Sequence, residues 1–391
     1  MPGRIVLYGA TGYIGGLTAR AMVASGSRPV LAGRHRGRLT ALAEQLSRAG
    51  DGIELETAVA GSEEPGPLRE LIGPGDVLVS TAGPFLKVGR SVVEAAVDAG
   101  AVYLDSTGEP PFIRQVFEEF GPRAEHTGAV LLTAFGYDYV PGNLAGALAL
   151  QAAGPAAAQV RVGYFVRGNT RKATSAGTRA SVAGVLLEPG YSFRGGRLVT
   201  ERTAARVASF EVGGSRRRAF SIGSSEHFAL PRLRQAASTG TGDNDGMPAG
   251  APLTDVGVYL GWFGAATELV HFVSALAAPL ERLPGVRGAL DQQAGRIQRS
   301  RATPDAGETI RSDVVAVAAA ARGRRLATVH LTGGDPYSFT APVLAWAAGR
   351  AAAQGVRPAG ALGPAEAFGL TSLERACAEA GFHRKPGRKD A

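Results

Sequence analysis

The chain has 391 residues, of which 45% are hydrophobic and 19% are charged, and its formal net charge is +8. This length exceeds a usual single core, so we expect two domains. A single cysteine, Cys377, excludes an intrachain disulfide, and the histidines lack ligand spacing, so no metal site is predicted. No basic stripe is interleaved with aromatic residues, which argues against a nucleic-acid partner. The net charge favours anionic partners: phosphorylated cofactors, acyl carriers or lipid surfaces.

No run of about 18 uncharged apolar residues occurs, so no membrane-spanning helix is expected. The first residues pass directly into an apolar strand pattern without the features of a signal peptide. The sequence therefore predicts a cytoplasmic protein.

The first 135 residues alternate short apolar runs with helical patterns. Apolar runs of this kind indicate a parallel sheet covered by helices on both faces. After residue 150 this alternation ends, and the sequence pattern becomes typical of strands in a mostly antiparallel sheet. We predict a Rossmann-type doubly wound domain at 1–150 and an α+β substrate or dimerisation domain at 151–340. The predicted strands of the two regions are 4–10, 29–34, 54–60, 76–82, 101–107 and 129–135, then 160–168, 195–201, 205–214 and 216–223, with two further strands within 313–339.

Three glycines separate the first strand from the first helix: Gly9, Gly12 and Gly15. In this context the first permits a tight turn, the second lets the backbone approach a pyrophosphate, and the third lets helix and strand pack closely. The phosphates would lie at the positive end of the helix. The pattern predicts a dinucleotide site, and a purely structural turn is the alternative.

The second strand ends in LAGRHRGRL, without the acidic residue that usually binds the ribose of NAD. Arg34 is placed to pair with a 2′-phosphate, together with Arg38, through charge-assisted bonds. We therefore predict NADP(H) as the cofactor. Solvated surface arginines are the alternative, since the chain is rich in arginine.

Ligands of this fold lie beyond the carboxyl ends of the strands. The fourth strand ends in Thr81, Ala82, Gly83 and Pro84, which we expect to run along the cofactor. The ends of the fifth and sixth strands, 105–109 and 136–141, should line its nicotinamide half.

Several motifs resemble the saccharopine dehydrogenase-like NAD(P)-binding family, in particular its actinobacterial branch of trans-acting enoyl reductases. They are GATGYIG, LAGR, STAGPF, YLDSTGE, FGYDYVPGNLAG, SAGTRASVAG (175–184), GGDPYSFTA (333–341) and GVRPAGALGPAEAFGL (355–370). The resemblance implies an inserted substrate domain and C-terminal helices, 341–391, that return to the first domain. It also implies cofactor contacts by Gly9, Thr11, Gly12, Tyr13, Ile14, Gly15, Arg34, Thr81, Ala82, Gly83 and Pro84. The polar groups that would bind saccharopine itself are not identifiable.

A competing class, the short-chain dehydrogenases, carries a catalytic tyrosine four residues before a lysine. None of the nine tyrosines here has a lysine at that spacing, which argues against this chemistry.

Tyr137, Asp138 and Tyr139 at the end of the sixth strand are the catalytic candidates. A tyrosine hydroxyl could donate a proton to an enolate, with Asp138 orienting it. The favoured alternative for Asp138 is capping of the helix that opens at 141–142, and the tyrosines could equally be core residues.

Residues 256–283 read as a long helix with a broad apolar face formed by Val256, Tyr259, Leu260, Phe263, Leu269, Phe272 and Leu276. A core or dimer-interface helix is favoured. An acyl tunnel, or a peripheral membrane contact beside Arg216, Arg217 and Arg218, is the alternative.

Together these features predict an NADPH-dependent oxidoreductase that reduces a C=C or C=O bond of a hydrophobic polyketide or acyl intermediate, free or carrier-bound. The alternatives are a non-catalytic NADP-binding partner in lipid assembly, and a C=N or ketone reductase. A homodimer is a further expectation.

Overall fold

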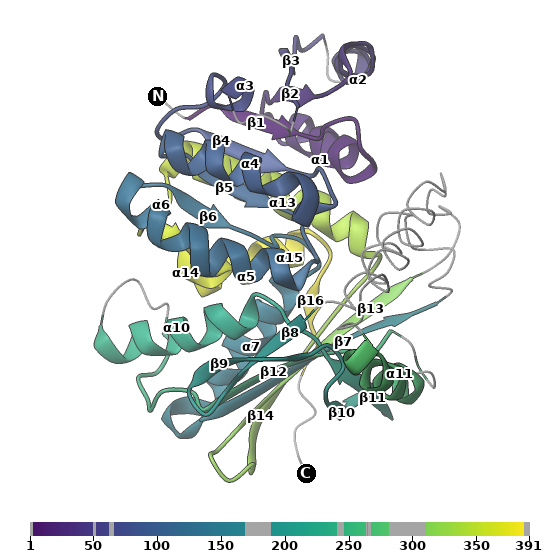
Figure 1. Cartoon of the computed structure of the whole chain (residues 1–391), viewed down its shortest axis with the longest axis vertical. Helices are drawn as coiled ribbons and strands as arrows, with labels where there is room; N and C mark the ends of the chain where they lie inside the picture. The colour runs from purple at the N-terminus through teal and green to yellow at the C-terminus, as the bar shows by residue number, and fades with distance from the viewer. Residues whose placement is uncertain are drawn as a thin grey trace. The chain divides into compact units, whose positions relative to one another are not determined.

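The computed structural model describes residues 3–49, 52–61, 66–168, 189–240, 246–262, 264, 267–280 and 310–386. The chain forms two compact units. Figure 1 colours the chain by residue number. Unit 1 comprises Met1–Gly108, Phe112–Val140 and Pro336–Phe368, and unit 2 comprises Glu109–Pro111, Pro141–Asp335 and Gly369–Ala391.

Unit 1 is built on a seven-stranded parallel sheet with the order β15-β6-β5-β4-β1-β2-β3. Its inner strands are buried along their whole length, because most of their residues are branched or aromatic apolar residues that face helices on both sides. The order reverses between β1 and β4, which creates the switch point where this fold binds ligands. The predicted Rossmann-type sheet is therefore confirmed. The strands are β1 (Ile5–Tyr8), β2 (Val30–Gly33), β3 (Thr57–Val59), β4 (Val77–Ser80), β5 (Val102–Asp105), β6 (Val130–Leu132) and β15 (Gly360–Ala361).

The helices of unit 1 follow the predicted alternation, and α1 packs along α13. They are α1 (Tyr13–Ala24), α2 (Arg36–Ala49), α3 (Gly66–Arg69), α4 (Phe85–Ala99), α6 (Gly121–Thr127), α13 (Pro336–Gln354) and α14 (Pro364–Phe368). Between β5 and α6 the chain forms α5 (Pro110–Gln115), which spans the division between the units, and the π-helical turn η1 (Val116–Phe120).

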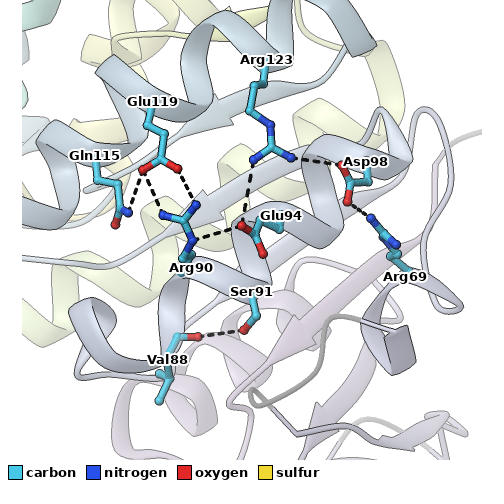
Figure 2. A network of polar contacts seen from close by, with 9 residues as sticks. All are labelled: Arg69, Val88, Arg90, Ser91, Glu94, Asp98, Gln115, Glu119 and Arg123. Carbon is cyan, nitrogen blue, oxygen red and sulfur yellow. Dashed lines mark hydrogen bonds and ion pairs between the residues drawn. The ribbon is translucent and has the colours of Figure 1, made fainter.

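A network of ion pairs joins α3, α4, η1 and α6 on the surface of unit 1 (Figure 2). Arg90 binds Glu119 through two nitrogens and Glu94 through Nε at 3.1 Å. Each exposed pair contributes at most about 1 kcal/mol, so the network orders these helices more than it stabilises the fold. The remaining pairs are Arg123 with Glu94 and Asp98, and Arg69 with Asp98.

Unit 2 contains a second, mixed sheet with the order β10-β11-β12-β7-β13-β14-β16, and β8 joins β9 to β12. Of the strand pairs in the described residues, only β7 with β12 is parallel, and the others are antiparallel. The strands are β7 (Gln159–Arg167), β8 (Pro189–Arg194), β9 (Arg197–Arg202), β10 (Val207–Val212), β11 (Ser215–Ser221), β12 (Asp255–Leu260), β13 (Arg311–Ala319), β14 (Arg325–Gly333) and β16 (His383–Arg384). The helices are α7 (Val140–Ala153), η2 (Gly154–Ala156), α10 (Glu226–Thr239), α11 (Thr267–Leu280) and α15 (Leu370–Glu379).

The division between the units differs from the predicted boundaries at two places. From Pro141 onward α7 belongs to unit 2 rather than ending the first domain, and its Asn143 donates a hydrogen bond to Ser225 Oγ at 3.0 Å. Residues after 368 also belong to unit 2 instead of returning to the first domain, because β16 pairs with β14. Helical patterns alone do not reveal which sheet a helix covers.

The prediction of one helix over 256–283 is wrong in its first half. Val256, Tyr259 and Leu260 lie in the buried strand β12, and helix begins only at Thr267. A strand that is buried on both faces reads as a continuous apolar run, which periodicity cannot distinguish from a buried helix. Phe272 on α11 is 66% exposed, whereas Phe263 and the side chains of Leu269 and Leu276 lie outside the described residues.

Among the helices that the structure describes, none is both long and apolar enough to cross a membrane.

Candidate functional site

The turn between β1 and α1 has the geometry of a phosphate-binding loop. Gly9 has φ +81°, which only glycine adopts readily, and a Cβ there would lie 2.9 Å from the Ala82 nitrogen. A Cβ at Gly15 would collide with the Gly9 carbonyl oxygen. The first and third glycines are therefore both required, one by the backbone conformation and one by the close packing of α1 on the turn.

The N-terminus of α1 is open. Gly12 precedes the helix in an extended conformation, and its N–H donates to the Gly9 carbonyl at 2.9 Å. No side chain caps the helix, and its first turn carries no acidic residue. Orphan N–H groups and the positive end of the helix dipole suit an anionic ligand. This arrangement fits the pyrophosphate of a dinucleotide.

Arg34 and Arg38 are both exposed, just beyond the carboxyl end of β2. Within the described part of the chain neither guanidinium forms an ion pair or a side-chain hydrogen bond. Because β2 is the neighbour of β1 in the sheet, these two charges lie on the ribose side of the glycine turn. Their unused donors fit a 2′-phosphate.

The segment 81–84 lies beside the glycine turn. The hydroxyl of Thr81 donates to the carbonyls of Tyr8 and Gly9 at 3.1 and 3.2 Å, so it holds the turn in place. Ala82 and Gly83 follow, and Pro84 precedes α4. Thr81 therefore positions the turn, and Ala82 and Gly83 are left to line its edge.

The first turn of α13 also reaches this region, although the sequence assigned it no site role. Tyr337 contacts the 43%-exposed ring of Tyr13 edge to face, with ring centroids 5.2 Å apart. Thr340 Oγ1 accepts a hydrogen bond from the Tyr137 N–H at 3.0 Å. The sequence feature that could have pointed to this helix turn is the motif at 333–341, which supports only the family resemblance in the sequence analysis.

Asp105, at the end of β5, organises the end of β6. Its Oδ1 accepts from the N–H groups of Thr107 and Ala134, both at 2.9 Å, and its Oδ2 accepts from Thr133 Oγ1 at 2.8 Å. Ala134 has φ 57°, a left-handed conformation that costs energy for a residue with a Cβ. Burial raises the pKa of Asp105 to about 6, although these hydrogen bonds oppose the shift. Asp105 thus holds the loop that carries the predicted catalytic residues.

Asp138 lies in that loop and faces the end of β5. A Cβ at Gly108 would lie 3.2 Å from its Oδ2. The residue is partly exposed, yet desolvation of the carboxyl group by its surroundings raises its pKa to about 7. Across the described residues no donor binds this carboxylate, and the structure shows no hydrogen bond from it to the first turn of α7. The favoured expectation that Asp138 caps this helix is therefore wrong.

Tyr137 and Tyr139 flank Asp138 and are each only 2% exposed. The Tyr139 N–H donates to the Ala134 carbonyl at 2.8 Å, so the loop turns back on itself. Two buried rings on either side of a partly exposed carboxyl group suit a supporting role better than direct contact with a substrate.

The model of the saccharopine dehydrogenase NADP-binding domain matches residues 5–132. Residues 5–132 are therefore similar to the NADP-binding domain of saccharopine dehydrogenases. The matched region contains the glycine turn, both arginines beyond β2 and the segment 81–84, so NADP is the cofactor that their geometry fits.

Curated relatives share part of this chain. A putative trans-acting enoyl reductase of Mycobacterium tuberculosis is 39% identical over 142 residues, which is 36% of this chain and 33% of that protein. A trans-acting enoyl reductase of Mycobacterium ulcerans is 36% identical over 142 residues, covering 36% and 34%. The chain thus spans about a third of the length of the curated relatives it matches.

Among solved structures, a β-ketoacyl-[ACP] reductase from Bacteroides thetaiotaomicron is similar over 34% of this chain and 79% of its own. The identity is 14% and the TM-score is 0.28, so this likeness carries no weight for function.

Proposed function

We propose that this protein is an NADPH-dependent reductase that saturates the C=C bond of an enoyl thioester with a hydrophobic acyl or polyketide chain. The observation that carries the proposal is the pairing of an NADP-binding turn with a partly exposed, donor-free carboxyl group, Asp138, at the carboxyl edge of the same sheet. The names of the mycobacterial relatives support enoyl reduction in particular.

The cofactor, when bound, supplies a hydride to the β-carbon of the double bond. The chain must then hold the thioester, stabilise the enolate that develops and deliver one proton to the α-carbon. Asp138 is suited to deliver that proton, because a carboxyl group with a pKa of about 7 is substantially protonated at neutral pH.

The residues around Asp138 have positioning roles in this scheme. Asp105 holds the strained Ala134, and Thr340 holds the Tyr137 backbone, so the loop between β6 and α7 presents the carboxyl group in one orientation. Such preorganisation avoids the cost of ordering the acid during the reaction.

The test is to follow NADPH oxidation by the purified protein with a crotonyl thioester, the matching β-ketoacyl thioester and an imine. Oxidation with only the enoyl substrate, and transfer of deuterium from labelled NADPH to the β-carbon of the product, is the expected result. Turnover of only the ketone or the imine would reassign the bond that is reduced. Tight NADPH binding with no oxidation of any of the three would favour a non-catalytic NADP-binding partner.

A further inference from the structure

Unit 2 contains a cavity of about 400 Å³ that the proposed reaction does not use. It lies at the start of β11 and extends to the beginning of α11. The polar and charged residues on its wall are Ser215, Arg216, Arg217, Arg218, Thr267 and Glu268.

The charges of this cavity are unbalanced. Arg218 Nε is 2.7 Å from Glu268 Oε1, so that pair is neutral. In the described part of the chain, Arg216 and Arg217 form neither an ion pair nor a side-chain hydrogen bond, although Glu211 lies opposite Arg216 in the β10–β11 register. The Nε of Arg217 is buried without an acceptor. A buried donor without a partner is costly, and an anion in the cavity would relieve that cost.

The beginning of α11 adds a second source of positive potential. Thr267 is its first residue, and its hydroxyl donates to the Gly264 carbonyl at 2.8 Å and contacts the Arg218 carbonyl at 3.5 Å. These bonds place the positive end of a 14-residue helix beside the arginines of β11.

The geometry points to a binding site for a phosphate or pyrophosphate group carried on a larger molecule. Two guanidinium groups with free donors and a helix N-terminus match the charge and multiple acceptors of such a group. The volume falls in the range of small-molecule sites, so it exceeds what a bare anion needs. One source of such a group rests on the proposed function, since coenzyme A and carrier-bound thioesters hold their acyl group on a phosphate-bearing arm.

The test is calorimetric titration of the full chain with sodium pyrophosphate and with coenzyme A at low salt, with and without saturating NADP⁺. NADP⁺ occupies the anion site beside Arg34, so binding that persists in its presence belongs elsewhere. The Arg216→Ala/Arg217→Ala double variant should weaken this binding by about tenfold or more. The matched control, Arg194→Ala/Arg197→Ala, removes the same charge from exposed positions of the β8–β9 hairpin and should leave affinity nearly unchanged.

The ligands separate the possible sources. Coenzyme A binding more tightly than pyrophosphate identifies a carrier-type arm, whereas co-sedimentation with phosphatidylglycerol vesicles that the double variant loses identifies a lipid headgroup. Equal affinities in wild type, double variant and control would overturn the site. That result would leave the proposed NADP⁺ binding and enoyl reduction unaffected. Conversely, a protein that binds phosphate at this site but oxidises no NADPH would refute only the proposed function.

Discussion

Asp138 in unit 1 and Asp313 in unit 2 are both shielded carboxyl groups, and their surroundings are opposite. Burial would raise the pKa of Asp313, but hydrogen bonds from His330 at 2.7 Å and Lys385 at 3.0 Å, with Arg167 at 2.6 Å, hold it well below its usual range. Asp138 has no such donors among the described residues, and desolvation raises its pKa to about 7. A carboxylate supplied with three basic groups is part of the fold, whereas one left without donors is a functional candidate.

The largest effect should come from Asp138→Asn, which removes the proposed acid and keeps the shape of the side chain. We expect kcat to fall by about 10²- to 10⁴-fold while NADPH affinity is unchanged. The measurement is NADPH oxidation with an enoyl thioester across pH, in which the wild type should lose activity as pH rises through about 7. If the Asp138→Asn enzyme keeps the wild-type rate and pH profile, the proton comes from another donor. In the parallel variants Tyr137→Phe and Tyr139→Phe we expect a much smaller loss.

Asp313→Asn should have the largest effect on stability. It leaves three basic groups around a neutral amide, and breaking a buried ion pair typically costs about 3–5 kcal/mol. Chemical denaturation of the variant measures this loss, with Asp255→Asn as control. Asp255 lies in the same sheet, and among the described residues its carboxylate accepts only a long hydrogen bond, 3.4 Å, from the Gln159 amide. Equal loss in the two variants would mean that the cation cluster contributes nothing specific.

Arg34→Ala should weaken NADPH binding by about tenfold or more and leave NADH binding unchanged, since only NADPH carries the 2′-phosphate. Nicotinamide fluorescence titration measures both affinities. Arg28→Ala is the control, because Arg28 is exposed and lies just before the opposite end of β2. Equal affinity of the wild type for NADPH and NADH would contradict the proposed role of Arg34.

The smallest effect concerns how the two carboxyl groups link stability to pH. The folded pKa of Asp138, about 7, lies above its ordinary value of 3.8, so the folded state binds the extra proton between these values. The contribution of Asp138 to the free energy of unfolding is present below about pH 4 and is lost as the pH rises through about 7. Asp138→Asn should therefore gain on the order of 1 kcal/mol above pH 7, discounted for partial exposure.

Asp313 should have the opposite dependence. Its folded pKa is lowered, so its contribution is present above its unfolded pKa and is lost as pH falls through the folded value. Unfolding curves of the two Asn variants over a pH series would show this contrast, and parallel curves would contradict it.

The local pattern of the chain was sufficient for the cofactor turn and for six of the seven strands of the unit 1 sheet, and only β15 is missing from the prediction. Gly9 and Gly15 are read from their spacing because the turn has a short-range geometric requirement that no other residue meets. Arg34 follows in the same way from its place at the end of a strand. In unit 2 the sequence pattern predicts β7, β9, β10, β11, β13 and β14 but not β8 or β16, and it assigns β12 to a helix.

The tertiary structure decided what depends on contacts between distant segments. It placed the first turn of α13 against Tyr13 and Tyr137, and it surrounded Asp313 with three basic groups. Among the described residues it also left the Asp138 carboxylate without a hydrogen bond to the helix it was expected to cap. Whether a carboxyl group is paired or only desolvated depends on residues tens to hundreds of positions away, so its pKa and its role are properties of the packed fold.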